Sequence, residues 1–441
     1  MSWGCAYFFC ILAANYALRP LRDEMGVIGG TDEIPRLFMF TLAGTVVLTP
    51  LFSMLVSRLS RRRFIPLLYR FFQVTLLGFF LMIWTQPKEQ LVHVAQVFFV
   101  WASVLNIFAV SVFWCFMADL FSSEQGKRLF GLIGFGGTIG ALFGSSIATL
   151  LARQVEPVFL LIAVILLLEA AIRSVHRLAG VFGLRTQAPQ SETYAVAALA
   201  DLEPTHREAR PVELVYASTP EKASPSAEVP LRTDNALTAL LRTFASPYLS
   251  GIVVCMIAYT ISSSFLYLDQ SRIVGAQIAD SGQRTVYFAR IDLYVNAISL
   301  VVQALLTARI IAALGVGWSH ALLPIVTIAG FAGLWWSPSV ALLLWVQVLR
   351  KAGDYAVAKP AREVLFTVIR REEKYKSKSW IDTFMYRAGD ALGGGAYWLF
   401  QDARIGTSSV LVIPLSAIWW IAAILLGRRQ RQLAAAHQNP D

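Results

Sequence analysis

The chain has 441 residues, of which 56% are hydrophobic and only 15% are charged, and its formal net charge is +10. A soluble protein carries about 25% charged residues. This composition therefore excludes a soluble multidomain protein and indicates that a lipid bilayer is the solvent. The four cysteines form no CxxC pair and the five histidines form no HExxH motif. Neither a disulfide framework nor a zinc site is indicated, and we expect no cofactor.

Apolar stretches of about the length that crosses a bilayer recur along the chain. They predict an all-α integral membrane protein with twelve transmembrane helices, over residues 2–18, 37–57, 64–84, 91–118, 129–152, 157–173, 246–270, 285–308, 320–337, 339–358, 381–401 and 408–427. The segment 174–245 is rich in Ala, Pro, Glu and Ser, which is typical of a largely disordered linker. We thus expect two six-helix halves (1–173 and 246–430) and a tail (431–441), the plan of two-halved secondary transporters.

The basic residues predict the orientation in the membrane. With the N-terminus in the cytoplasm, the short inside loops hold about twice as many Lys and Arg residues as the outside loops. This count assigns the basic residues from Arg350 to Lys378, at and beyond the end of the tenth span, to an inside loop. We therefore expect both termini and the linker to be cytoplasmic, in a plasma membrane of the bacterial inner-membrane type. The positive charge then indicates anionic lipids as partners, and it does not indicate nucleic acid. We expect the protein to be a monomer.

Glycines recur at spacings of four in two predicted spans. Gly136, Gly140 and Gly144 lie in the fifth span, and Gly389 and Gly393 lie in the eleventh. Small residues at this spacing allow two helix backbones to approach closely. We interpret them as helix-packing positions, with the sharper alternative that smooth packing also permits sliding between two access states.

The loop after the second predicted span reads SMLVSRLSRRRFIP. Arg58, Arg61 and Arg62 match the basic positions of the major-facilitator loop pattern, which this segment resembles. The resemblance implies a major-facilitator-like fold. A gating role for these arginines and a simple positive-inside role both remain open.

Charged residues inside spans mark candidate functional positions, because an ionisable group in hydrocarbon costs about 3 kcal/mol or more unless it is paired or hydrated. The eleventh span holds Asp382, Arg387 and Asp390, of which the last two can pair within the helix. Asp292 is an isolated acid in the eighth span. We expect Asp390, Asp382 or Asp292 to take a coupling proton, and Arg387 and Arg70 to contact a solute. The alternative is that the eleventh-span charges only hold helices together.

The first span ends in NYALRPLRDEMGV, where charged residues follow directly on an apolar helix. If the helix continues past Pro20, Arg19 and Arg22 project from one face toward whatever the bundle encloses. Guanidinium groups bind phosphate or carboxylate through two parallel hydrogen bonds. We interpret Arg19 and Arg22 as solute-binding residues. The alternative is an extracellular loop with ordinary ion pairs.

Three segments carry a family resemblance: NYALRPLRDEMGV, FWCFMADLFSSEQGKRLFGLIGFGGTIGALFG and KAGDYAVAKPAREVLFTVIRREEKYKSKSWIDTFMYRAGDALGGG. They are similar to motifs of the ATP/ADP antiporter family, the nucleotide carriers of plastids and intracellular bacteria. The resemblance implies a twelve-span carrier and places Arg22 where that family uses a Lys to meet substrate phosphate. The chain departs from the family at Asp390, where the family has a Lys, and at Ala102, which aligns with a family acid.

A polyphosphate would meet an acid at Asp390 instead of a cation, so we expect a changed substrate and a proton in place of the counter-nucleotide. The leading prediction is a secondary active transporter for a small anionic solute, phosphorylated or carboxylated. The alternative is nucleotide exchange of the ATP/ADP type. The sequence has no GxxxxGK[ST] motif, and no His/Asp or Cys/His arrangement is evident. We therefore expect neither ATP hydrolysis nor an enzyme. The alternatives from other classes are a membrane-embedded enzyme acting on lipid or sugar and a non-transporting receptor or scaffold.

Overall fold

The computed structural model describes residues 2–58, 61–87, 90–120, 123–181, 246–369, 386–400 and 407–438. Every regular element within these ranges is helical. The predicted all-α architecture is confirmed.

The first half is a bundle around a central first helix. Its helices are α1 (Ser2–Ile28), α2 (Ile34–Arg58), α3 (Arg61–Thr85), α4 (Leu91–Leu120), α5 (Ser123–Gln154) and α6 (Leu160–Val181). α1 packs against α4, α5 and α6, which explains why most of its residues are buried. α6 continues eight residues beyond the predicted end of the sixth span at residue 173.

The second half repeats this plan. Its helices are α9 (Pro247–Gln277), α10 (Ser281–Leu305), α11 (Thr307–Trp336), α12 (Val340–Gly353), α13 (Lys359–Leu365), α15 (Tyr386–Tyr397) and α16 (Ser409–Gln438). A π-helical turn over Asp354–Ala358 joins α12 and α13 into one continuous helix. Ser246, Asp280 and Ser339 cap the starts of α9, α10 and α12, because each side chain accepts a hydrogen bond from a backbone N–H of the first turn.

One predicted loop is instead helical. The sequence pattern placed a connection between residues 308 and 320, whereas α11 begins at Thr307 and contains a sharp break at Gly315. Gly315 has a φ of 75°, which glycine adopts without the Cβ clash that other residues meet. Two helical segments therefore meet at a kink at Gly315, within the range labelled α11.

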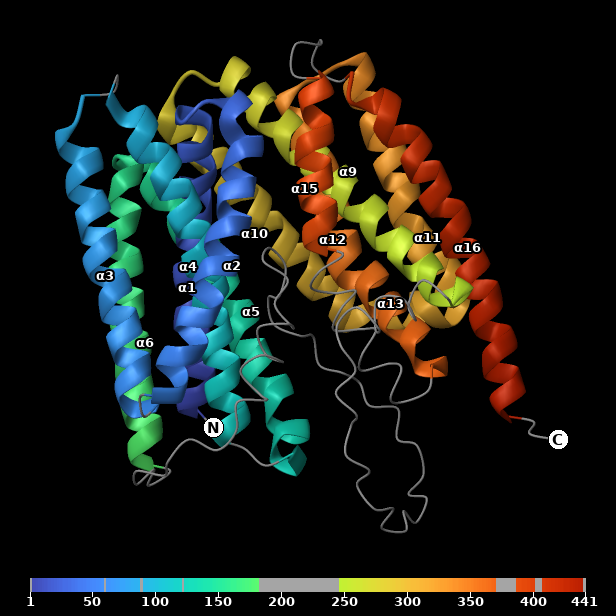
Figure 1. Ribbon diagram of the computed structural model, residues 1–441, viewed down its shortest axis with the longest axis horizontal. Coiled ribbons are helices and arrows are strands. Elements are labelled where there is room, and N and C mark those ends of the chain that lie inside the picture. The colour runs from blue at the N-terminus through green and yellow to red at the C-terminus, as the bar shows by residue number, and fades with distance from the viewer. Residues whose placement is uncertain are drawn as a thin grey trace.

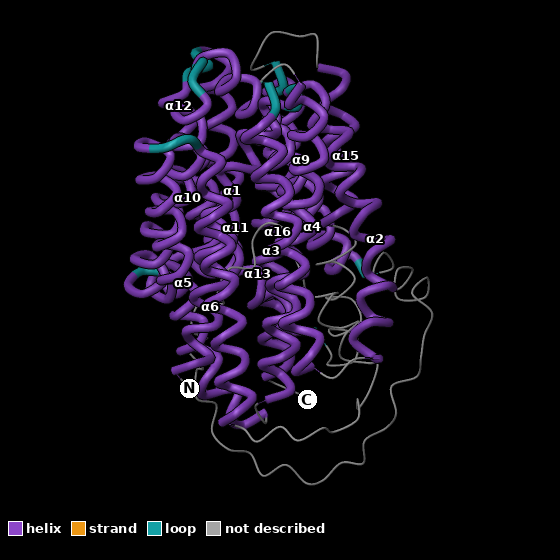
Figure 2. Tube along the Cα trace, turned by 90° about the vertical axis from the view of Figure 1, so that its left-hand side faces the viewer, coloured by secondary structure: helices purple, strands orange, loops and turns teal. Residues whose placement is uncertain are grey.

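The helices have the dimensions of a membrane bundle. Eight helices in the described part of the chain are long and apolar enough to cross a membrane. The predicted first span is part of the longer helix α1, whose last ten residues include four charged side chains. The start of α1 and the end of α16 lie at the same end of the bundle (Figures 1 and 2). The opposite end is called the remote end below.

The repeated glycines allow two equivalent close contacts, one in each half. A Cβ on Gly140 or Gly144 would overlap the backbone of α1 at Phe9 or Ala13. In the second half, a Cβ on Gly389 or Gly393 would overlap side chains of α9. The fifth helix thus packs on the first helix of its half, and α15 packs on α9 in the same way. These contacts support the interpretation of the glycines as packing positions.

The two halves meet along α1, α2 and α5 on one side and α9, α10 and α15 on the other. α5 packs on α10, and α2 packs on α15. Several predicted features lie outside the described residues: the linker from 182 to 245, Asp382, and the side chains of Arg58, Arg61, Arg62 and Arg387.

Candidate functional site

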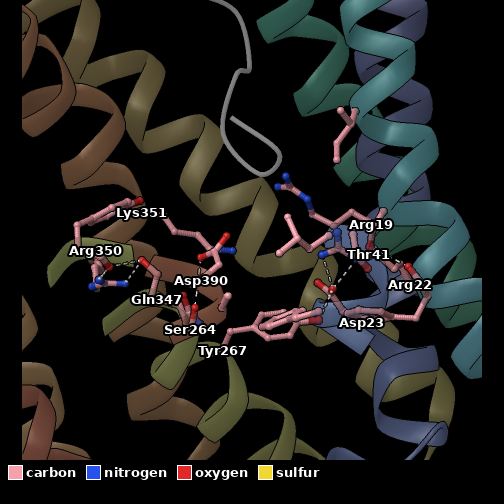
Figure 3. Close-up of a pocket in the computed structure, with 18 residues that line it drawn as sticks. Arg19, Arg22, Asp23, Thr41, Ser264, Tyr267, Gln347, Arg350, Lys351 and Asp390 are labelled. Carbon is pink, nitrogen blue, oxygen red and sulfur yellow. Dashed lines mark hydrogen bonds and ion pairs between the residues drawn. The ribbon is translucent and has the colours of Figure 1, made fainter. Parts of the chain in front are cut away.

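A cavity lies at the junction of the two halves (Figure 3). Its wall is formed by α1, α2 and α4 of the first half and by α9, α12 and α15 of the second. The space between the lining atoms is about 1130 Å³ with the open mouth included. Its charged lining residues are Arg19, Arg22, Asp23, Arg350, Lys351 and Asp390.

The first half contributes two arginines and one acid from α1, which continues past Pro20 as a helix to Ile28. Arg22 donates two hydrogen bonds to Asp23, from Nε and Nη2 to Oδ1 at 3.0 and 2.6 Å. Its guanidinium also lies over the ring of Phe99, 5.5 Å from the centroid. Tyr267 of the second half donates to the same Asp23 oxygen at 2.9 Å. The Arg22 side chain is therefore held in place at the cavity wall.

The second half contributes Arg350, which the sequence analysis assigned to a cytoplasmic loop. The structure corrects this, because Arg350 lies in α12 and is only 3% exposed. Its guanidinium donates to Thr327 Oγ1, Ser263 Oγ and Ser262 Oγ and to the Tyr259 carbonyl, at 2.5–3.0 Å. These hydroxyl and carbonyl acceptors fix the orientation of a positive charge at the cavity wall.

Lys351 was assigned to the same loop and also lies in α12 at the cavity. Its Nζ is 3.9 Å from Asp292 Oδ1, and Arg19 Nη1 lies 3.3 Å from that same oxygen. Asp292 is a buried residue of α10. A single carboxylate thus contacts one cation from each half.

Asp390 lies on the second-half side of the cavity, at the end of the first turn of α15 (Figure 3). Its Oδ1 accepts a hydrogen bond from Ser264 Oγ at 3.3 Å. Near it, Gln347 donates to Gln270 at 2.5 Å. This wall therefore offers a carboxylate and neutral hydrogen-bonding groups beside the two cations of α12.

A second link between the halves lies nearer the remote end of α1. Arg284 of α10 donates from Nε and Nη2 to the two carboxylate oxygens of Glu24, each at 2.7 Å. Arg284 also donates to the backbone carbonyls of Ile278 and Ala279. Glu24 is fully buried. Together with the Asp23–Tyr267 and Arg19–Asp292 contacts, this pair ties α1 to the second half.

The structure brings together some of the predicted site residues. Arg19, Arg22 and Asp390 line the cavity, and Asp292 contacts two lining residues. Arg70 lies elsewhere, on α3, where its Nη1 is 2.6 Å from Glu169 Oε2 of α6 and its side chain is 56% exposed. Arg70 is therefore not part of this cavity.

Comparisons with known proteins address the fold. No family model matches the chain, and no curated protein matches it. Among solved structures it is similar to an auto-inhibited peptide transporter of the POT family, with a TM-score of 0.61 and 12% identity over 98% of this chain and 96% of that one. It is also similar to a bacterial homologue of the iron transporter ferroportin in an inward-facing state, with a TM-score of 0.61 and 10% identity over 98% and 97% of the two chains.

The chain is also similar to a bacterial homologue of ferroportin in an outward-facing state with soaked iron, with a TM-score of 0.53 and 12% identity over 98% of this chain and 99% of that one. At such low identity these likenesses establish the fold alone. They cover nearly the whole chain, so the predicted all-α, major-facilitator-like membrane fold is confirmed.

Proposed function

We propose that this protein is a secondary active transporter that carries a small anionic solute, phosphorylated or carboxylated, by alternating access of its two halves. The observation that supports this most is the charge of the central cavity, whose lining has four cationic and two acidic side chains. Cations are costly in a membrane interior and are concentrated where they serve a pathway or a ligand. An excess of cationic side chains around the cavity favours an anionic solute.

The position of the cavity supports movement as well as binding. Transporters of this architecture bind solute where the two halves meet, and the halves then rock about that site. Here both halves contribute cations, Arg19 and Arg22 from α1 and Arg350 and Lys351 from α12. A bound anion would therefore contact both moving bodies at once. We assign direct solute contact to Arg22 and Arg350, whose planar guanidinium groups suit carboxylate and phosphate.

Nucleotide exchange is the second candidate, and the cavity wall supplies one reason for it. Phe38, Phe99 and Tyr267 line the cavity near Arg22, and aromatic rings can stack on a nucleobase. Arg22 also keeps the cation of the ATP/ADP antiporter motif that the first span resembles. Asp390 opposes this candidate, because it puts a negative charge where a polyphosphate needs a cation.

We further propose that the driving force is a proton taken up by Asp390. This carboxylate faces the cavity and accepts a hydrogen bond from the Ser264 hydroxyl. A site that is exposed to the cavity and faces the bound solute can exchange its proton with whichever side the cavity opens to. Asp292 is a less suitable candidate, because it does not line the cavity and instead contacts Arg19 and Lys351 from within the protein.

Ligand binding by the purified protein tests the proposed solute class. A ligand that binds only the folded form raises the midpoint of thermal unfolding. We expect at least one phosphorylated or carboxylated metabolite to stabilise the wild-type protein, with that response lost in Arg22→Ala. Arg36→Ala is the matched control, since Arg36 pairs with Glu33 on the surface and does not line the cavity. Stabilisation by neutral or cationic metabolites alone would contradict the proposal.

A further inference from the structure

Asp292 occupies an unusual position behind the cavity wall. Its side chain is 5% exposed, and its Oδ1 lies 3.3 Å from Arg19 Nη1 and 3.9 Å from Lys351 Nζ. Both of these cations line the cavity, whereas Asp292 is not among the lining residues. The carboxylate therefore contacts, from the protein side, the same two charges that a solute would meet from the cavity side.

The two cations come from different halves. Arg19 belongs to α1, and Lys351 belongs to α12, while Asp292 itself lies on α10. A carboxylate placed between them reduces their mutual repulsion and draws the halves together. An anionic group placed in the cavity would perform the same task, so the solute and Asp292 compete for the same pair of charges.

We propose, on the basis of the proposed function, that Asp292 is an internal counter-ion which the anionic group of the solute displaces from Arg19 and Lys351. On release, the Asp292 carboxylate takes these two cations back. The solute is then one whose carboxylate or phosphate can reach both cations at the same time. Asp292 is a positioning residue in this account, because it acts through Arg19 and Lys351 and does not touch the solute.

This exchange has a consequence for the rate of transport. A solute that has to displace an existing counter-ion binds less tightly than one that meets the same two cations without that competitor, but it also leaves more readily. Removing the carboxylate of Asp292 should therefore strengthen binding and slow release. A residue with only a structural role would weaken binding and transport together.

Isothermal titration of the purified protein with inorganic phosphate, a compact anionic probe, tests the inference. We expect Asp292→Asn to bind phosphate about tenfold more tightly than the wild-type protein. Glu169→Gln is the matched control, since Glu169 is also bound to arginines but lies outside the cavity, and its phosphate affinity should equal that of the wild type. Equal or weaker phosphate binding by Asp292→Asn, including no binding by either protein, would overturn the inference.

A second pair of variants covers the case in which Asp292→Asn does not fold. Arg19→Gln/Asp292→Asn removes both members of an ion pair and leaves no new uncompensated buried charge at that pair. It should bind phosphate more tightly than Arg19→Gln alone, because Lys351 is then released from Asp292. No difference between these two variants would also overturn the inference. The metabolite screen reports on the proposed function separately, because it can succeed with the wild-type protein whatever Asp292→Asn does.

Discussion

Arg284 and Glu24 join the two halves of the bundle through two parallel hydrogen bonds of 2.7 Å, between residues 260 positions apart in the chain. Glu24 lies four residues before the remote end of α1, which places this pair between the cavity and that end. In the proposed alternating-access cycle, the cavity opens at that end in another state. The Glu24–Arg284 pair would break in that step, so we propose that it acts as a gate.

We predict that Glu24→Gln shifts the protein toward a state that is open at the remote end. The variant keeps the size of the side chain but loses the charge that holds Arg284. Spin labels on Glu156→Cys and Ser337→Cys report the distance between the halves once the four native cysteines are replaced by alanine. Both are exposed positions near this pair: Ala152 of the first half approaches Gly282 at the start of α10, and Gln277 at the end of α9 donates a hydrogen bond to the carbonyl of Pro338. A longer-distance population should grow in double electron–electron resonance measurements.

Glu33→Gln serves as the control for this measurement. Glu33 lies near the same end, but its partner Arg36 belongs to the same half and the pair is exposed. Its distance distribution should match that of the parent protein. A distribution that shifts equally in both variants would show that Glu24 has no special role as a gate.

We predict that Gly140→Ala lowers the free energy of unfolding by about 1–3 kcal/mol, the usual cost of overpacking. The added methyl group would overlap the backbone of Phe9 and push α5 away from α1. Gly78→Ala on α3 is the control, because a Cβ there meets no atom within 4 Å. Denaturant titration in detergent should show Gly78→Ala to be neutral or slightly stabilising; equal stability of the two variants would contradict the close packing.

We predict that Arg350→Lys lowers both stability and solute affinity, although the charge is retained. A lysine cannot reproduce hydrogen bonds from three guanidinium nitrogens, and each buried acceptor left without a donor costs about 1–3 kcal/mol. Arg309→Lys, at an exposed position of α11, should change neither property. Thermal unfolding with and without the best solute from the metabolite screen measures both effects. Unchanged solute affinity in Arg350→Lys would show that Arg350 does not contact the solute.

We predict that Asp390→Asn binds solute but no longer accumulates it against a concentration gradient when a pH gradient is imposed. The amide resembles the protonated acid and still accepts a hydrogen bond from Ser264. Exchange of solute at equal concentrations should survive. Continued accumulation by the variant would show that the coupling site lies elsewhere.

The helices could be predicted from the sequence because hydropathy alone identifies segments of spanning length. The contribution of α1 to the cavity could be predicted because Arg19 and Arg22 share one helix face. It missed Arg350 and Lys351. Basic residues near a span end are ordinarily counted as loop residues, and that rule misplaced two cations that lie within α12. One signal was available: Arg350 follows Gln347 by three residues on an apolar helix, so the two polar side chains lie on the same helix face.

The cross-half contacts could not be predicted in the same way. Asp292 was recognised as an acid inside a span, but its partners Arg19 and Lys351 are distant in sequence and come from two other helices. No local sequence pattern predicts these contacts, since they depend on how the two six-helix halves pack. Whether Asp390 or Asp382 couples to protons, and whether Arg387 contacts a solute, stay predictions.

Uptake into proteoliposomes tests the central claim most directly. Wild-type protein should give saturable uptake of at least one phosphorylated or carboxylated solute, above the level of protein-free liposomes, and Arg22→Ala should abolish it while Arg36→Ala retains it. Uptake restricted to neutral or cationic solutes, or anion uptake that Arg22→Ala leaves unchanged, would contradict the account.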